Sequence, residues 1–210
     1  MTDIASDPSP VEPGPSALLL IHREEVPQIH TQEFGAIEAG IARSCLELGC
    51  PHPYLGLQTI SGEHEVWFLN GFASVAEQED VGRRYLANSP LMSALAAPSR
   101  RKAALVKVLG EHLASYRFEQ GAGTPWSLGR DPYLVIAMGR EAMPAGAAYE
   151  APDGTWFTLE GAPDAQTAVT RSQRCRGAAR ALAVRPDWSC PSTDWARRYP
   201  ELWSAPRIDE

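Results

Sequence analysis

The sequence predicts an α+β fold built on a split β-α-β unit, and three observations lead to this prediction. An apolar strand is followed by an amphipathic helix with a clear end. A hairpin of two apolar strands comes next. A helix with a strong start signal then follows the hairpin directly. The order strand, helix, hairpin, helix and strand is that of the split β-α-β arrangement.

The first strand is expected over residues 17–26, where alternate residues share a face. Leu18, Leu20 and His22 fall on one face of this strand. A helix is expected over residues 31–48, because apolar residues recur there at steps of three and four. That apolar stripe consists of Phe34, Ile37, Ile41, Cys45 and Leu48. Gly49 fits the left-handed position that commonly follows a helix.

The hairpin is expected to pair residues 54–60 with residues 65–72. On the second strand Asn70 shares a face with three apolar residues, and Trp67 lies on the opposite face, so both faces are expected to be buried. The motif Ser74-Val-Ala-Glu77 is a capping box that predicts a helix to about residue 87. Two shorter helices and a weak strand are then expected, over about residues 89–97, 100–109 and 114–120.

The second part of the chain is expected to add a strand, a second hairpin and one long helix. Residues 133–138 predict a buried strand, and an Asp153-Gly154 turn between strand-like runs predicts the hairpin. An alanine- and arginine-rich stretch predicts the helix over residues 164–184. The tail tryptophans are expected to lie on short helical turns that fasten onto the body, or alternatively to form a recognition surface.

These elements divide the chain into a disordered tail over residues 1–16, an α+β half over residues 17–120, and a second half or extension over residues 121–210. The tail is rich in proline, serine and acidic residues, which bury too little surface to offset the entropy of ordering. The rest is expected to form a packed core, since 44% of all residues are hydrophobic.

Charge and segment composition limit the partners and the compartment. The net charge of -7 repels phosphate backbones, so nucleic acid is not an expected partner. No secretory signal or membrane-spanning run is recognisable, which predicts a cytoplasmic protein with no membrane partner. None of the four cysteines forms a C-x-x-C pair, so they are expected to be reduced thiols.

The strand EVWFLNGF, leading into the capped helix SVAEQED, gives a first half that resembles the dimeric α+β barrel superfamily of ferredoxin-like folds. It is most similar to the NIPSNAP-like and antibiotic-biosynthesis-monooxygenase-like branches, over about residues 17–120. The resemblance implies a sheet with helices on one face and a cavity-lining face that packs on a partner sheet. It therefore implies a homodimer, or a pseudo-dimer if the second half supplies the partner sheet. No helix is recognisable between residues 133–138 and the second hairpin, so this half would be a degenerate repeat.

Nucleotide-binding, zinc-protease and serine-hydrolase motifs are all missing, so candidate site residues come from single side chains. His22 lies mid-strand among apolar residues and could act as a general base, or it could be a structural histidine. His64 opens the return strand of the hairpin and could be catalytic, or it could be an exposed turn residue. Trp67, Asn70 and Tyr54 are the candidate ligand contacts, and Trp67 alternatively belongs to the core.

The first functional hypothesis is a protein that binds a small apolar or aromatic molecule, with a cofactor-independent monooxygenase-like activity as its enzymatic form. No cofactor and no metal are expected, although a haem- or metal-associated protein is a weaker third hypothesis. The second hypothesis is a non-enzymatic protein whose sheet face serves dimerisation or partner binding. A cavity beside residues 54–72 would favour the first hypothesis.

Overall fold

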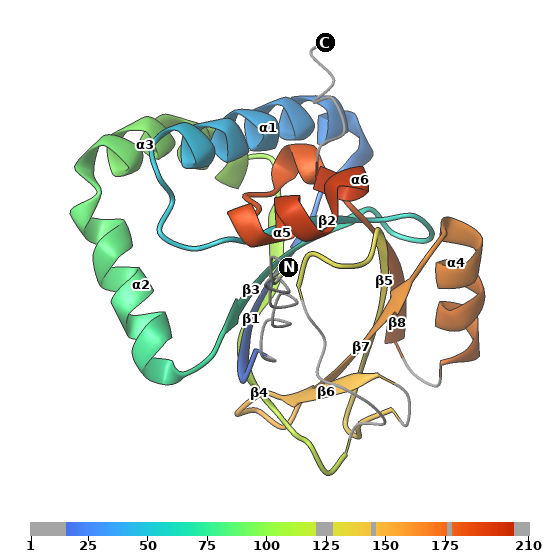
Figure 1. Ribbon diagram of the computed structural model, residues 1–210. Coiled ribbons are helices and arrows are strands. Elements are labelled where there is room, and N and C mark those ends of the chain that lie inside the picture. Colours follow the sequence, from blue (N-terminus) through green and yellow to red (C-terminus); the bar gives the residue numbers. More distant parts are fainter. Residues whose placement is uncertain (1–15, 121–127, 144–145, 176–177, 204–210) are drawn as a thin grey trace, which may run out of the picture.

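Eight antiparallel strands close into a barrel in the order β1-β3-β2-β8-β5-β7-β6-β4 (Figure 1). The computed structural model describes residues 16–120, 128–143, 146–175 and 178–203. Within these ranges the strands are β1 (Leu18–Glu25), β2 (Leu55–Thr59), β3 (Glu65–Phe72), β4 (Lys107–Tyr116), β5 (Tyr133–Gly139), β6 (Ala147–Glu150), β7 (Trp156–Ala162) and β8 (Ala178–Val184). The predicted α+β fold is therefore confirmed as a closed barrel with helices outside it.

The first half contributes β4-β1-β3-β2, with β3 hydrogen-bonded between β1 and β2. Its helices are η1 (Gln28–His30), α1 (Thr31–Glu47), α2 (Val75–Ala87) and α3 (Ser89–Ala103). Figure 1 shows α1, α2 and α3 outside the barrel, on the side of these four strands. The predicted strands of residues 17–26, 54–60 and 65–72 thus lie in one sheet, and the helices of this half cover only its outer face.

The second half repeats the strand order of the first. Counted within each half, the order is fourth, first, third, second: β4-β1-β3-β2 in one and β8-β5-β7-β6 in the other. One helix, α4 (Ala165–Arg174), joins β7 to β8, and the described part of the connection from β5 to β6 contains no helix. The pairs β2–β8 and β4–β6 join the two halves, so the chain closes the barrel without a second copy.

The inside of the barrel is packed with apolar side chains, because alternate residues of each strand point inward. This core cluster contains Leu19, Ile21, Leu55, Leu57, Trp67, Leu69, Ala114, Leu128, Leu134, Ile136, Ala147, Tyr149, Ala151, Phe157, Leu159, Leu182, Val184 and Trp195. Trp195 comes from α5 (Thr193–Arg198), which follows η2 (Pro186–Trp188) and precedes α6 (Pro200–Trp203). The tail therefore forms short helical turns that fasten tryptophans onto the body, as predicted.

The long helix predicted over residues 164–184 is wrong. The helix α4 ends at Arg174, and β8 begins at Ala178 and pairs with both β2 and β5. Alanine favours helix locally, but two neighbouring strand edges offer β8 a full ladder of hydrogen bonds, and tertiary context overrides so weak a preference. Within that segment Arg180, Leu182 and Val184 are spaced two residues apart and lie toward the barrel, and this spacing is typical of a strand.

The elements between residues 89 and 120 also differ from the prediction. The two short helices form one helix, α3, which continues through Pro98 to Ala103 and is capped by Asn88 rather than Ser89. The strand β4 then covers residues 107–116, where a helix end and a weak strand were expected. Pairing with β1 along its whole length outweighs the weak local pattern of this segment.

The remaining predicted elements are confirmed with small shifts at their ends. The second hairpin forms as β6 and β7, with Gly154 at a φ of 77° in the turn. Of the predicted tail over residues 1–16, only Ser16 falls within the described residues, and residues 121–127 also lie outside them. Within the described part of the chain, no helix is long and apolar enough to span a bilayer.

Candidate functional site

A cavity of about 330 Å³ lies between α2 and the outer face of β1 and β3, beside the first hairpin. We call it the α2 cavity. It is lined by Leu20, Cys50, His52, Tyr54, Asn70, Phe72, Gln78, Val81, Gly82 and Tyr85. Its size falls within the range of about 300–1,000 Å³ that is typical of small-molecule sites.

The sheet wall of the α2 cavity follows from the register of β1 on β3. Leu20 pairs directly with Asn70, and Leu18 pairs with Phe72, so these side chains share the outer face. Because the side-chain period of a strand is two, the same register turns Trp67 and Leu69 into the barrel. The face predicted for Asn70 is therefore the face that lines the cavity.

The helix wall of the α2 cavity is fixed by the predicted capping box. Ser74 Oγ accepts a hydrogen bond from the Glu77 backbone N–H at 3.2 Å, and Glu77 Oε2 accepts one from the Ala73 N–H at 2.6 Å. The first bond caps the helix at Ser74, and the second holds the residue before the cap, so together they fix where the helix begins. The lining residues of α2 are Gln78, Val81, Gly82 and Tyr85, whose spacings of three and four place them on one face.

Two polar side chains in the cavity wall share one backbone acceptor. His52 Nδ1 donates to the Pro53 carbonyl oxygen at 2.8 Å, and Asn70 Nδ2 donates to the same oxygen at 3.3 Å. The His52 ring stacks on Phe72 with 4.5 Å between ring centroids. Burial lowers the pKa of His52, so its imidazole is neutral at pH 7. With Nδ1 protonated, Nε2 carries a lone pair.

Three thiols gather behind the cavity, in an apolar cluster with Tyr54 and Tyr85. Cys45 is buried at the end of α1, Cys50 is half-buried in the cavity wall, and Cys190 is held against Tyr54 by a backbone bridge. Hydrogen bonds from Cys190, then from Cys45, lower the pKa of Cys50. The hydrogen bond to Cys50, together with burial, raises the pKa of Cys45. The described cysteines form no disulfide.

His22 lies outside the α2 cavity, in an ionic network under α1 and α3. Its Nε2 lies 3.0 Å from Glu24 Oε1, and its Nδ1 lies 3.3 Å from Glu111 Oε2. Lys102 bridges Glu24 at 3.2 Å and Glu38 at 2.9 Å. The hydrogen bond to Glu24 raises the pKa of His22 despite the opposing effect of burial. This arrangement is that of a structural ion-pair network.

The two carboxylates of this network differ in their pKa shifts. Burial raises the pKa of Glu38, and the charge of Lys102 only partly offsets it. Burial also acts on Glu24, but the hydrogen bond from His22 and the charge of Lys102 outweigh it, so the pKa of Glu24 is lowered. Burial also disfavours the charged form of Lys102, but the two carboxylates outweigh this effect and raise the pKa of Lys102.

Trp67 lies inside the barrel beside a buried carboxylate. Its indole Nε1 donates to Glu65 Oε2 at 3.0 Å, and the guanidinium of Arg23 lies 4.5 Å from its ring centroid. Arg23 also binds Glu65 at 3.2 Å, and Arg180 Nε binds it from β8 at 2.7 Å. Burial opposes ionisation of Glu65, but the two arginines outweigh it and lower its pKa.

His64 lies in a separate, open depression of about 830 Å³ beside the N-terminal end of α1. The Gln58 side-chain amide donates through Nε2 to His64 Nε2 at 2.6 Å. A further cavity of about 250 Å³ lies between α4 and the outer face of β5 and β7. No group of three or more His, Cys, Asp or Glu side chains within the described ranges is placed to bind a metal ion.

The structure therefore brings Tyr54 and Asn70 together in one cavity and places His22, His64 and Trp67 elsewhere. The cavity residues that sequence reasoning missed are chiefly Cys50, His52 and Tyr85. Tyr85 was detectable, since it lies four residues after Val81 on the capped helix. Cys50 and His52 lie in a connection without periodicity, and only the fold brings them to the sheet.

No protein-family model matches the chain, and no curated protein matches it closely. Among solved structures, a proposed monooxygenase from Fusobacterium nucleatum is 7% identical with a TM-score of 0.48, covering 80% of this chain and 91% of that one. A proposed monooxygenase from Lactobacillus acidophilus is 6% identical with a TM-score of 0.44, covering 80% and 94%. A mutant chlorite dismutase from Candidatus Nitrospira defluvii is 10% identical with a TM-score of 0.42, covering 83% and 92%. The fold assignment rests on the strand order of the barrel.

Proposed function

We propose that the protein binds a small apolar or aromatic molecule in the α2 cavity. The observation that carries this proposal is a cavity of about 330 Å³ whose wall is mostly apolar and includes Asn70, His52 and Tyr54. A mostly apolar pocket with a few convergent polar groups is the usual form of a small-molecule site. The tyrosine hydroxyl is buried, and burial raises its pKa, so it stays a neutral phenol.

The wall indicates the chemistry of the ligand. His52 stacked on Phe72 offers an aromatic surface, and the neutral His52 ring has one lone pair to accept a hydrogen bond. Among the described residues the Asn70 side chain bonds through Nδ2 to Pro53, which leaves its amide oxygen as a second acceptor. Two acceptors beside apolar walls favour a flat, neutral molecule with a hydroxyl or N–H donor.

Binding of 2-naphthol, a flat phenol, tests the proposal by two-dimensional ¹H–¹⁵N NMR. A leucine at Gly82 would narrow the cavity without strain, since a Cβ there meets no atom within 4 Å. The matched control is Gly40→Leu, on the exposed face of α1, where a Cβ also meets no atom within 4 Å. Asn70→Leu removes one acceptor and keeps the number and branching of the side-chain heavy atoms.

We expect shift changes to cluster at the cavity residues of β3 and α2. We also expect Gly82→Leu to weaken binding about tenfold or more, Asn70→Leu to weaken it by a similar factor, and Gly40→Leu to leave it unchanged. Shift changes confined to the barrel ends, or equal affinity in all variants, would contradict the assignment of the ligand to this cavity.

A second candidate function is cofactor-independent oxygenation of the bound aromatic, and His52 favours it. A neutral imidazole in the cavity wall can remove a proton from an activated methylene of an anthrone-like ligand. The carbanion then reduces O₂, and the methylene becomes a carbonyl while the second oxygen leaves as water (R₂CH₂ + O₂ → R₂CO + H₂O). Oxygen uptake with anthrone that falls in His52→Phe by a much larger factor than the affinity for 2-naphthol would support this function. Binding without oxygen uptake would leave a non-enzymatic binding protein.

The finer family assignment is also a proposal. The matching strand order of the halves favours two ferredoxin-like split β-α-β units fused into one barrel, with no helix in the described part of the second unit's first connection. It is compatible with the NIPSNAP-like or antibiotic-biosynthesis-monooxygenase-like branches. A homodimer would then associate through surfaces outside the barrel. Sedimentation equilibrium over a range of concentrations tests for this homodimer, and a single monomeric mass would refute the homodimer.

A further inference from the structure

We propose that Cys50 and Cys45 form a dithiol centre in the wall of the α2 cavity, which reacts with a small hydroperoxide and closes a disulfide between the two sulfurs. This inference does not depend on the ligand proposed above. It concerns the thiols that lie behind the cavity, and it assigns them a substrate class of their own.

The end of α1 is the feature that brings the two thiols together. Gly49 has a φ of 69°, and the Cys50 backbone N–H donates to the Cys45 carbonyl at 2.7 Å. This bond from the second residue after the cap to the third-last residue of the helix defines a Schellman motif. The motif usually places an apolar contact between the side chains at these two positions. In this chain both positions are cysteine, and they lie in the same apolar cluster.

The two sulfurs have different surroundings, which assigns them different roles. Cys50 is half-buried and lines the cavity, so a small molecule in the cavity reaches it. Cys45 is 1% exposed and sits behind it, with its sulfur 3.9 Å from the Tyr85 hydroxyl. Hydrogen bonds, first from Cys190 and then from Cys45, favour the thiolate on Cys50, and the pKa of Cys45 is raised. The accessible sulfur is thus the nucleophile, since the thiolate is the reactive form.

The chemistry is a two-electron oxidation in two steps. The Cys50 thiolate attacks the terminal oxygen of the hydroperoxide, the O–O bond breaks, and the alkoxide leaves as an alcohol after protonation. Cys50 is then a sulfenic acid. The Cys45 sulfur attacks the Cys50 sulfur, the S–O bond breaks, and water leaves with the thiol proton. The sum is two thiols and ROOH giving a disulfide, ROH and water.

Cys190 is the competing partner, because it contacts the same cluster from the segment that pairs with Tyr54. The Schellman geometry favours Cys45, since one backbone hydrogen bond holds the two residues of that pair in place. Peptide mapping separates the two outcomes. Trypsin releases Cys45 and Cys50 on one peptide, between Arg43 and Arg83, whereas Cys190 is on another.

The test treats the reduced full-length protein with one equivalent of hydrogen peroxide and follows it by mass spectrometry. We expect the peptide after Arg43 to lose the mass of two hydrogen atoms without becoming linked to another peptide. We expect Cys190→Ala to behave in the same way, and Cys50→Ala to slow oxidation about tenfold or more. Cys45→Ser should stop at a sulfenic acid on Cys50 that dimedone traps.

The matched control is Cys175→Ala, since Cys175 is a half-buried cysteine on the other half of the barrel whose pKa burial raises. This variant should oxidise at the wild-type rate. A disulfide that joins Cys50 to Cys190, or alkylation of Cys50 no faster than that of Cys175, would overturn the proposal. The disulfide pairing and the alkylation rates are both measured on the wild-type protein, so the test remains valid even if a variant does not fold.

Discussion

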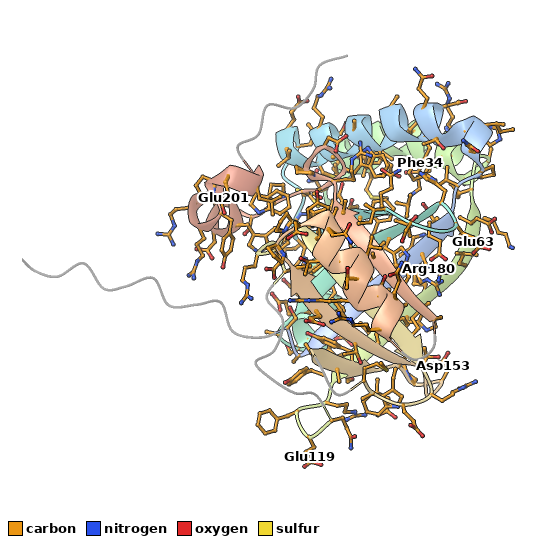
Figure 2. All side chains as sticks on the ribbon, turned by 90° about the vertical axis from the view of Figure 1, so that its right-hand side faces the viewer. Phe34, Glu63, Glu119, Asp153, Arg180 and Glu201 are labelled. Carbon is orange, nitrogen blue, oxygen red and sulfur yellow. The ribbon has the colours of Figure 1, made fainter. Side chains whose placement is uncertain are left out.

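Replacing Glu65 by glutamine tests whether two arginines stabilise the carboxylate charge of Glu65 inside the barrel. The Glu65 side chain is 1% exposed, and its carboxylate binds Arg180 Nε at 2.7 Å, Arg23 at 3.2 Å and the Trp67 indole at 3.0 Å. Figure 2 shows Arg180 on the same side of the molecule as Glu63, the exposed neighbour that it also contacts. The glutamine keeps the shape of the side chain and removes the charge.

The expected cost follows from what remains in the barrel. Two guanidinium groups would lie side by side without their shared buried counter-charge, and removing one partner of a buried ionic group typically costs about 3–5 kcal/mol. For a chain of this size that corresponds to a fall in Tm of roughly 6–20 °C. Urea denaturation at pH 7 measures the free-energy loss. Glu63→Gln is the control, because Glu63 is 77% exposed and lies 3.7 Å from Arg180, and it should change stability by less than about 1 kcal/mol.

The dependence of this loss on pH gives an independent check. The pKa of Glu65 is lowered in the folded state, so its contribution is complete above the unfolded pKa of about 4.3. That contribution disappears as the pH falls through the folded pKa. The stability difference between wild type and Glu65→Gln should therefore shrink below about pH 4. A loss under about 1 kcal/mol at pH 7, or a difference that does not change with pH, would refute this account.

Three further predictions concern the tail, the α2 cap and the outer ion-pair network. Trp195→Ala should cost about 3–5 kcal/mol in urea denaturation, because it empties a core position at the end of the barrel; a loss under about 1 kcal/mol would mean that the tail does not close the barrel. Ser74→Ala should cost about 1 kcal/mol and speed hydrogen exchange in α2, since it removes the cap on the Glu77 N–H; unchanged exchange would contradict the role of the cap. Lys102→Met leaves Glu24 and Glu38 without their shared cation and should cost about 3–5 kcal/mol at pH 7. In that variant burial would raise the folded pKa of Glu38 without the opposing charge of Lys102, so the loss should shrink as the pH falls toward 5, and a constant loss would argue against it.

Local patterns in the sequence were sufficient for the first half of the fold. Periodicity and the Ser74–Glu77 cap located the first strand, the first helix, the hairpin and the start of α2 within one or two residues. The face of Asn70 also followed, because a strand leaves only two choices for each side chain. The same reasoning failed over residues 178–184, where local alanine content favoured a helix and two strand edges required a strand.

The candidate site was predictable only in part, for a related reason. Tyr54 and Asn70 were named from the hairpin that carries them, and both line the α2 cavity. His22 and Trp67 were grouped with them because both lie on strands of the same predicted sheet, His22 as a possible base and Trp67 as an aromatic contact. In the structure His22 is hydrogen-bonded to Glu24, and Trp67 is hydrogen-bonded to Glu65. Local sequence patterns do not show which side chains these buried carboxylates contact.

The sequence by itself determined the identity and order of most elements of the first half, since capping, turn chemistry and side-chain period act over a few residues. Only the tertiary structure decided that the second half completes the barrel, that the α2 cavity opens between α2 and β3, and that Cys50 meets Cys45 and Cys190 there. These features depend on contacts between segments far apart in the chain. Such contacts form where burial and hydrogen bonding across the whole molecule outweigh local preference.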